Sequence, residues 1–90
     1  MKLKIYGYSD EGLAIEEIRP KELAEITLVA TPSELRKIVA FLTAAAEQME
    51  KMGSVYEHEH LADKQPGFEE SPHFVVFNPS AQQGLKSPAL

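Results

Sequence analysis

A capped amphipathic segment between Thr31 and Gly53 constrains the fold of this chain more than any other feature. Thr31-Pro32-Ser33-Glu34 forms a capping box with proline at the first helical position, so that the threonine hydroxyl accepts from the Glu34 amide and the glutamate carboxylate accepts from the Thr31 amide. Apolar residues then recur every three or four positions, at Leu35, Ile38, Val39, Leu42, Ala45, Ala46, Met49 and Met52. Gly53 is a typical stop signal. The pattern predicts one helix of about five turns with a single apolar face.

Short stretches of alternating polarity on both sides of this helix are typical of half-buried β-strands. Residues 2–8 and 13–18 are predicted to form a hairpin around a turn in which Gly12 adopts a positive φ, and residues 25–31 a third strand. Residues 54–61 and 73–78 are the strands predicted after the helix, separated by a polar loop over 63–72. The predicted fold is α+β: an antiparallel sheet of four to five strands with one long helix on one face, in the order β-β-β-α-β-β.

The length of the chain limits it to one hydrophobic core, because ninety residues cannot enclose two. We therefore expect a single domain over residues 1–79, followed by a disordered polar tail over 80–90. The chain has no cysteine, which excludes disulfides and thiolate metal sites and favours a reducing compartment. It shows neither the apolar run of a signal peptide nor that of a membrane helix, so the expected location is the cytoplasm.

The net charge of −5 argues against binding to nucleic acid, which requires a basic surface, and suits electrostatic attraction to a basic protein. A single helix can cover only one face of the predicted sheet. The other face is expected to be open to a partner, and the sheet edges allow either a monomer or a weak homodimer.

The three histidines all follow the predicted helix. His58 and His60 are two positions apart on a predicted strand, so their rings point to the same side about 7 Å apart, and His73 opens the next strand. With Asp63 as an oxygen donor, these residues form a candidate zinc or pH-sensing site. The plainer interpretation is that they are ordinary strand histidines, hydrogen-bonded to neighbouring side chains.

Glu57 and Glu59 alternate with the histidines along the same strand. Paired carboxylates can serve acid–base catalysis, but strands produce such pairs constantly, and a chain of this size is not expected to form a substrate cleft. Lys2 and Lys4 have the same spacing and are expected to face these glutamates across adjacent strands. In this orientation the glutamates lie on the open face, while Tyr56, His58 and His60 turn toward the helix.

Tyr6 and Tyr8 are predicted on the outer face of the first strand, either as exposed rings of a binding surface or as caps of the sheet edge. The chain has no Gly-x-Ser-x-Gly elbow and no glycine-rich phosphate loop. The sequence thus predicts neither an enzyme nor a cofactor.

Four stretches of the sequence resemble the immunity protein 32 family of bacterial polymorphic toxin systems. They are Met1-Lys-Leu-Lys-Ile-Tyr-Gly-Tyr8, Ile26-Thr-Leu-Val-Ala-Thr-Pro-Ser-Glu-Leu35, Tyr56-Glu-His-Glu-His-Leu-Ala-Asp63 and Phe74-Val-Val-Phe-Asn-Pro79. The resemblance implies a cytoplasmic protein that binds and neutralises a cognate toxin without catalysis of its own. It places the family's recurring segment on Glu57, His58, Glu59, His60 and Asp63.

The leading hypothesis is therefore a non-catalytic protein-binding module that recognises a toxin with a basic surface. Its candidate binding residues are Tyr6, Tyr8, Glu57, His58, Glu59, His60 and Asp63. The alternative is a small metal- or pH-responsive protein that uses His58, His60 and His73. A small enzyme is a third possibility, which would require a deep pocket.

Overall fold

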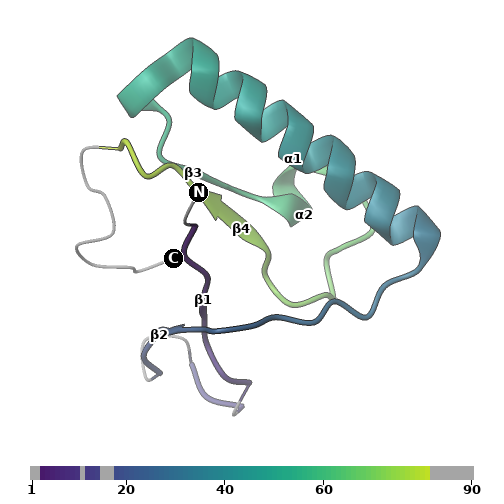
Figure 1. The fold of residues 1–90 in the computed structure, drawn as a ribbon. Coiled ribbons are helices and arrows are strands. Elements are labelled where there is room, and N and C mark those ends of the chain that lie inside the picture. The colour runs from purple at the N-terminus through teal and green to yellow at the C-terminus, as the bar shows by residue number, and fades with distance from the viewer. Residues whose placement is uncertain (1–2, 11, 15–17, 82–90) are drawn as a thin grey trace. The chain divides into compact units, whose positions relative to one another are not determined.

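The computed structural model describes residues 3–10, 12–14 and 18–81, and it divides the chain into two units that meet in the sequence between Val29 and Ala30. The elements are β1 (Tyr6–Gly7), β2 (Lys21–Glu22), α1 (Pro32–Met52), the 3-10 turn η2 (Gly53–Val55), β3 (His58–His60), α2 (Leu61–Lys64) and β4 (Val75–Phe77) (Figure 1). The α+β class is confirmed. Each unit is described in turn below.

The predicted sheet of four to five strands is wrong. Among the described residues the strands form two separate two-stranded antiparallel sheets, β1–β2 and β3–β4. The predicted third strand over 25–31 has no ladder partner in the described part of the chain, and its Val29 is 98% exposed. Alternating polarity permits a strand, but the strand forms only where a second strand satisfies its backbone groups.

The first unit is held by the pairing of β1 with β2, in which Tyr6 lies opposite Glu22 and Gly7 opposite Lys21. The predicted hairpin with a second strand at 13–18 is therefore wrong for Leu13, Ala14 and Ile18, while residues 15–17 lie outside the described part. A Cβ at Gly7 would meet the Leu23 side chain at 2.8 Å, so a larger residue at this position would have to displace that side chain. Gly12 has the predicted positive φ, at 73°.

The second unit is built on α1, whose predicted ends are confirmed. The Thr31 hydroxyl accepts from the Glu34 amide at 3.2 Å, and the Glu34 carboxylate accepts from the Thr31 amide at 2.6 Å. Gly53 caps the other end with φ of 58°, a conformation that favours glycine. The local signals in the sequence were sufficient here because both caps depend on residues within one turn of the helix end.

The buried side of α1 differs from the predicted apolar stripe. Ile38, Phe41 and Ala45 are buried, and Phe41, which the prediction omitted, is only 2% exposed. Some residues of the predicted stripe are instead exposed, namely Leu35, Val39, Leu42 and Met52. The helix therefore buries a narrow strip of its surface, centred on Phe41.

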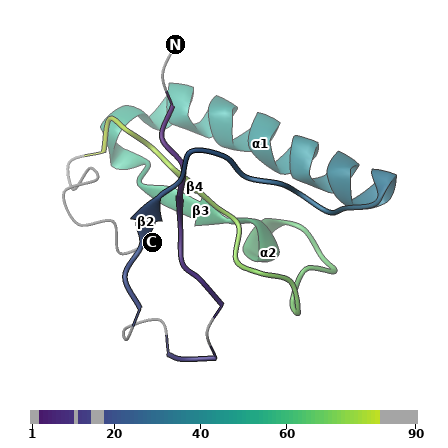
Figure 2. The same cartoon turned by 60° about the horizontal axis from the view of Figure 1, so that its bottom comes forward.

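The β3–β4 sheet packs against this strip of α1, as two views of the unit show (Figures 1 and 2). Phe74 and Val76 contact the buried cluster, and the ring of Phe74 meets that of Phe41 edge-on, with centroids 6.3 Å apart. A two-stranded sheet is marginal by itself in water, so this packing against the helix supplies much of its stability.

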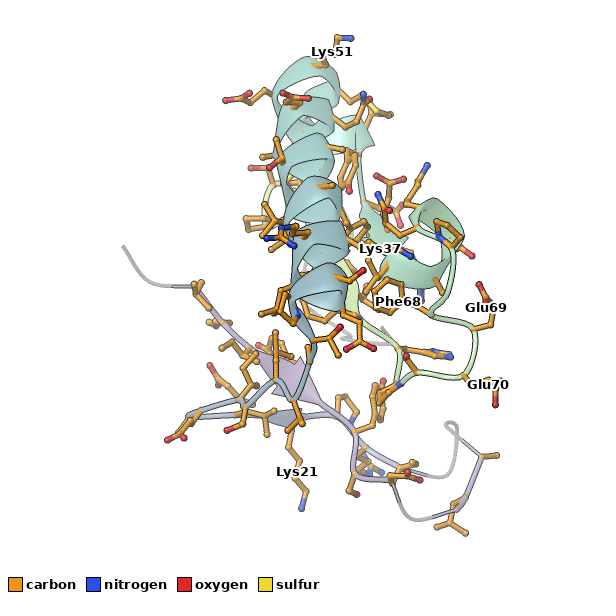
Figure 3. All side chains as sticks on the ribbon, turned by 90° about the vertical axis from the view of Figure 1, so that its right-hand side faces the viewer. Lys21, Lys37, Lys51, Phe68, Glu69 and Glu70 are labelled. Atoms are coloured by element: carbon orange, nitrogen blue, oxygen red, sulfur yellow. The ribbon has the colours of Figure 1, made fainter. Side chains whose placement is uncertain are left out.

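The polar segment between α2 and β4 contributes one anchor to the core. Phe68 is buried in the cluster with Ile38, Phe41 and Leu61. In Figure 3, Lys37 of α1 and Phe68 of this segment lie where the helix and the segment face each other, whereas the Glu69 and Glu70 side chains point outward. The Lys37 ammonium donates to the Pro66 carbonyl at 3.2 Å, which ties the segment to the helix.

The elements after α1 are shorter than the sequence predicted. The predicted strand over 54–61 divides into η2, β3 and the start of α2, and the predicted loop over 63–72 begins inside α2. The last strand is confirmed at Val75–Phe77. Of the predicted tail over 80–90, Ser80 and Ala81 form a turn in which Ala81 is buried, and the rest lies outside the described residues.

Candidate protein-binding surface

The register of the β3–β4 sheet fixes which side chains face the helix. His58 lies opposite Phe77, Glu59 opposite Val76 and His60 opposite Val75. Residues directly opposite each other in an antiparallel pair point to the same face. Because Val76 packs on the core beneath α1, Glu59 lies on the helix side of the sheet and the two histidines lie on the other side.

The predicted orientation of this strand is therefore wrong: Glu59 is on the helix side, and His58 and His60 turn away. Two partners make this position tolerable for a carboxylate that is only 22% exposed. The Tyr56 hydroxyl donates to Glu59 at 2.8 Å, and the Lys64 ammonium lies 2.7 Å from its other oxygen. Tyr56 itself is buried, as predicted, whereas Lys2, the expected partner of the glutamates, lies outside the described residues.

These contacts shift the proton affinities of all three groups. The hydrogen bond from Lys64 lowers the pKa of Glu59, outweighing the opposite effect of partial burial. Burial, followed by the neighbouring Glu59 carboxylate, raises the pKa of Tyr56 to about 12. The bond to Glu59 likewise raises the pKa of Lys64. At neutral pH the Tyr56 phenol is therefore neutral and donates to one oxygen of the ionised Glu59, whose other oxygen is paired with Lys64.

Glu57, by contrast, has a largely available carboxylate. Its side chain is 52% exposed, and its ion-pair contact is a long one, 3.9 Å from Nδ1 of His58. Glu57 has the same strand parity as Glu59 and lines the same side of the sheet. Glu57 thus presents a largely exposed carboxylate, whereas the carboxylate of Glu59 is neutralised by Lys64.

The rings on the opposite face of the sheet form a continuous row. Phe77 stacks on His58 with centroids 5.7 Å apart, His58 meets His60 at 5.4 Å, and His60 meets His73 at 6.0 Å. The prediction that the His58 and His60 rings share a side is confirmed. However, in the part of the chain that the structure describes, no group of three or more His, Cys, Asp or Glu residues could hold a metal ion.

Two hollows border β3. An open groove of about 620 Å³ runs between α1 and β3; its helix side includes Phe41, Ala44 and Met52, and its strand side includes Tyr56, Glu57 and Glu59. A smaller pocket of about 140 Å³ brings together His60, Asp63 and His73 at α2.

Asn78, which sequence reasoning missed, fixes the geometry of this region. Its side-chain amide donates to the Gly53 carbonyl at 3.0 Å and to the Tyr56 carbonyl at 2.8 Å, and its oxygen accepts from the Ser80 amide at 3.0 Å. Asn78 is only 4% exposed. It therefore ties the end of β4 to the turn that leads from α1 into β3.

The predicted residues of the first unit are placed separately. Tyr6 lies in β1 and is half-buried, and Tyr8 beyond the strand is half-buried as well. The structure thus describes these two tyrosines in the first unit and the other predicted binding residues in the second. No helix among the described residues combines the length and apolar character needed to cross a membrane.

Comparison with protein families gives one match, to the model described as immunity protein 32, over residues 25–79. The chain belongs to the immunity protein 32 family. The matched range contains α1, β3, α2 and β4, with the groove, the glutamates and the histidine row, and it begins after β1 and β2. The predicted resemblance is confirmed over this range. Neither the curated proteins nor the solved structures gave a match.

Proposed function

We propose that this member of the immunity protein 32 family neutralises a cognate toxin by binding to it in the cytoplasm, without catalysis. The observation that carries the proposal is the family match, which spans most of the packed second unit and all of its candidate surface. The net charge of −5 favours a toxin with a basic surface, because opposite charges accelerate encounter.

The binding surface proposed is the β3 region, with Glu57, His58, Glu59 and His60 at its centre and Asp63 at its border. Exposure of Glu57 and the groove beside it support this location. Tyr6 and Tyr8 of the first unit stay candidate contacts. We expect the free protein to be a monomer or weak homodimer that recognises neither nucleic acid nor membrane.

The first test is neutralisation of the toxin domain encoded by the adjacent gene. We expect cells that produce this domain to survive only when they also produce the present chain. In a purified mixture, inhibition should be complete at one equivalent of the chain and proportional below it, because a binder is consumed stoichiometrically. Complete inhibition at a small fraction of an equivalent would indicate a catalytic mechanism and contradict the proposal.

The second test is the salt dependence of association with an inactive variant of the same toxin domain. Electrostatic attraction between an acidic chain and a basic partner predicts an association rate that falls steeply as salt rises. The dissociation rate should change much less. An association rate independent of salt would contradict the basic partner while leaving toxin binding itself intact.

A further inference from the structure

The outer edge of β3 carries backbone groups that no other described residue satisfies. The Asn78 amide donates to the Glu57 carbonyl, and the Leu61 amide donates to the Phe74 carbonyl. With the observed register, these bonds make His58–Phe77 and His60–Val75 the non-hydrogen-bonded pairs of the ladder. The peptide N–H and C=O groups of His58 and the N–H of His60 therefore point away from β4, toward the outside of the sheet, whereas the His60 carbonyl accepts the first hydrogen bond of α2, for which His60 is the N-cap.

The groove between α1 and β3 lies beside this edge and can receive side chains from an added strand. Its helix wall is apolar at Ala44 and Met52, which suits the aliphatic stem of a long side chain. Its strand wall carries Glu57, whose exposed carboxylate suits a cationic head group, and Glu59, which is already paired with Lys64 of the same groove. An added strand presents every second side chain to this wall.

A second copy of the chain fits the edge poorly. Antiparallel pairing of two β3 edges through His58 and His60 has its symmetry axis at Glu59, so the His58 amide of each copy would need the His60 carbonyl of the other as its acceptor. That carbonyl already accepts the first hydrogen bond of α2, for which His60 is the N-cap. The exposed carboxylate of Glu57 favours an added strand with a basic side chain beside it, which is the charge expected of the proposed partner.

We infer that the toxin binds by adding an extended segment to the free edge of β3, with alternate side chains facing the groove and a lysine or arginine among them lying beside Glu57. Strand addition uses the backbone for affinity and the alternate side chains for specificity. This inference rests on the proposed function, since it names the mode by which the same surface recognises the toxin.

Amide hydrogen exchange of the full chain, measured by NMR, tests the edge before any partner is added. We expect the amides of His58 and His60 to exchange fast, while those of Leu61 and Asn78, which are bonded across the sheet, exchange slowly. Protection of His58 and His60 in the free protein would mean that the edge is already occupied and would overturn the inference.

Addition of the inactive toxin domain encoded by the adjacent gene should then slow exchange at His58 and His60 at least about tenfold, as new backbone hydrogen bonds form. Tight binding without this protection would overturn strand addition but leave the proposed function intact. Absence of any binding would contradict both. The two failures are therefore distinguishable.

Replacing His58 with proline tests what its backbone N–H contributes to binding, separately from what its side chain contributes. H58P removes the outward N–H and places the ring where a strand would join, while edge positions tolerate proline. The control H58A removes the same imidazole and keeps the N–H. Calorimetric titration with the inactive toxin domain should show H58P binding at least about tenfold more weakly than H58A, provided circular dichroism shows both folded. Equal affinities would overturn the inference.

A charge reversal provides a test that does not disturb the backbone. E57K places a cation beside the groove, and the control E50K makes the same change at an exposed position of α1 outside it. We expect E57K to weaken binding about tenfold or more and E50K about threefold or less. Equal losses would show that only net charge matters, which contradicts a basic side chain seated beside Glu57.

Discussion

The two units of this chain have similar apolar patterns but very different burial. The unit that begins at Ala30 encloses Phe41 and Phe68 in a common cluster. In the unit that ends at Val29, large apolar side chains such as Leu3 and Leu28 are exposed, and each strand has only two residues. The family match covers residues 25–79 and thus most of the packed unit. Packing around a capped helix, rather than apolar content, distinguishes the two.

The largest expected effect tests this difference in burial. Phe41→Ala should lower the free energy of unfolding by about 3–5 kcal/mol, because it leaves a cavity at the centre of the cluster. Two controls should each cost less than about 1 kcal/mol: Val39→Ala on the exposed side of the same helix and Leu28→Ala in the first unit. Urea denaturation measures the free energy of unfolding of all three variants. A loss at Leu28 as large as that at Phe41 would contradict the comparison.

The next effect concerns the polar clamp of the packed unit. Asn78→Asp keeps the shape of the side chain but replaces the amide that donates to Gly53 and Tyr56 with an acceptor. We expect a loss of about 1–3 kcal/mol in the free energy of unfolding at neutral pH, because the carbonyl of the buried Tyr56 loses its side-chain donor and the Gly53 carbonyl loses one of its two donors. Ser80→Ala, an exposed side chain next to the clamp, should change stability little. Equal stability of the Asp variant would show that these bonds are not needed.

The buried phenol predicts a loss of stability at alkaline pH. The pKa of Tyr56 is raised to about 12 in the folded chain, above the value near 10 that is usual for an unfolded chain. The stabilisation that the protonated phenol contributes is therefore complete below about pH 10 and is lost as pH rises through 12. Tyr56→Phe should cost about 1.5 kcal/mol at neutral pH, because Glu59 loses a donor, and should flatten this alkaline decline. Unfolding followed from pH 8 to about 12 tests both expectations. A decline that is as steep in the variant would contradict the role of Tyr56.

The smallest effect concerns the helix start. Thr31→Ala removes the hydroxyl that accepts from the Glu34 amide and should cost about 1 kcal/mol. Thr43→Ala, in the exposed interior of the same helix, should cost nothing or stabilise slightly, because alanine has the higher helix propensity. Thermal unfolding of both variants, followed by circular dichroism, separates a cap from a propensity effect. Equal losses would argue against the cap.

Features governed by neighbours in the sequence were predictable. Thr31 and Gly53 bracket the helix as expected, because caps act within one turn. The rings of His58 and His60 lie on one side of the strand, because strand alternation is local. Phe41 was also within reach of sequence reasoning, since it lies three residues after Ile38 on the same helix face.

Features governed by distant partners were not predictable. The sequence could not show that β4 would pair with β3 so that Glu59 lies opposite Val76 on the helix side of the sheet, and this pairing reversed the predicted orientation of the strand. The pairing of the strands failed for the same reason, since alternation does not specify a partner. Asn78 carried no signal beyond being polar, because its hydrogen bonds reach residues more than twenty positions earlier.

Mapping of the toxin contact by NMR tests the central claim most directly. The inactive toxin domain encoded by the adjacent gene would be titrated into the labelled full chain, and shift changes followed residue by residue. The account predicts that the largest changes fall on Glu57, His58 and His60, with changes along the groove at Ala44. Changes confined to residues 3–29, or to the exposed helix face at Leu35 and Val39, would contradict it.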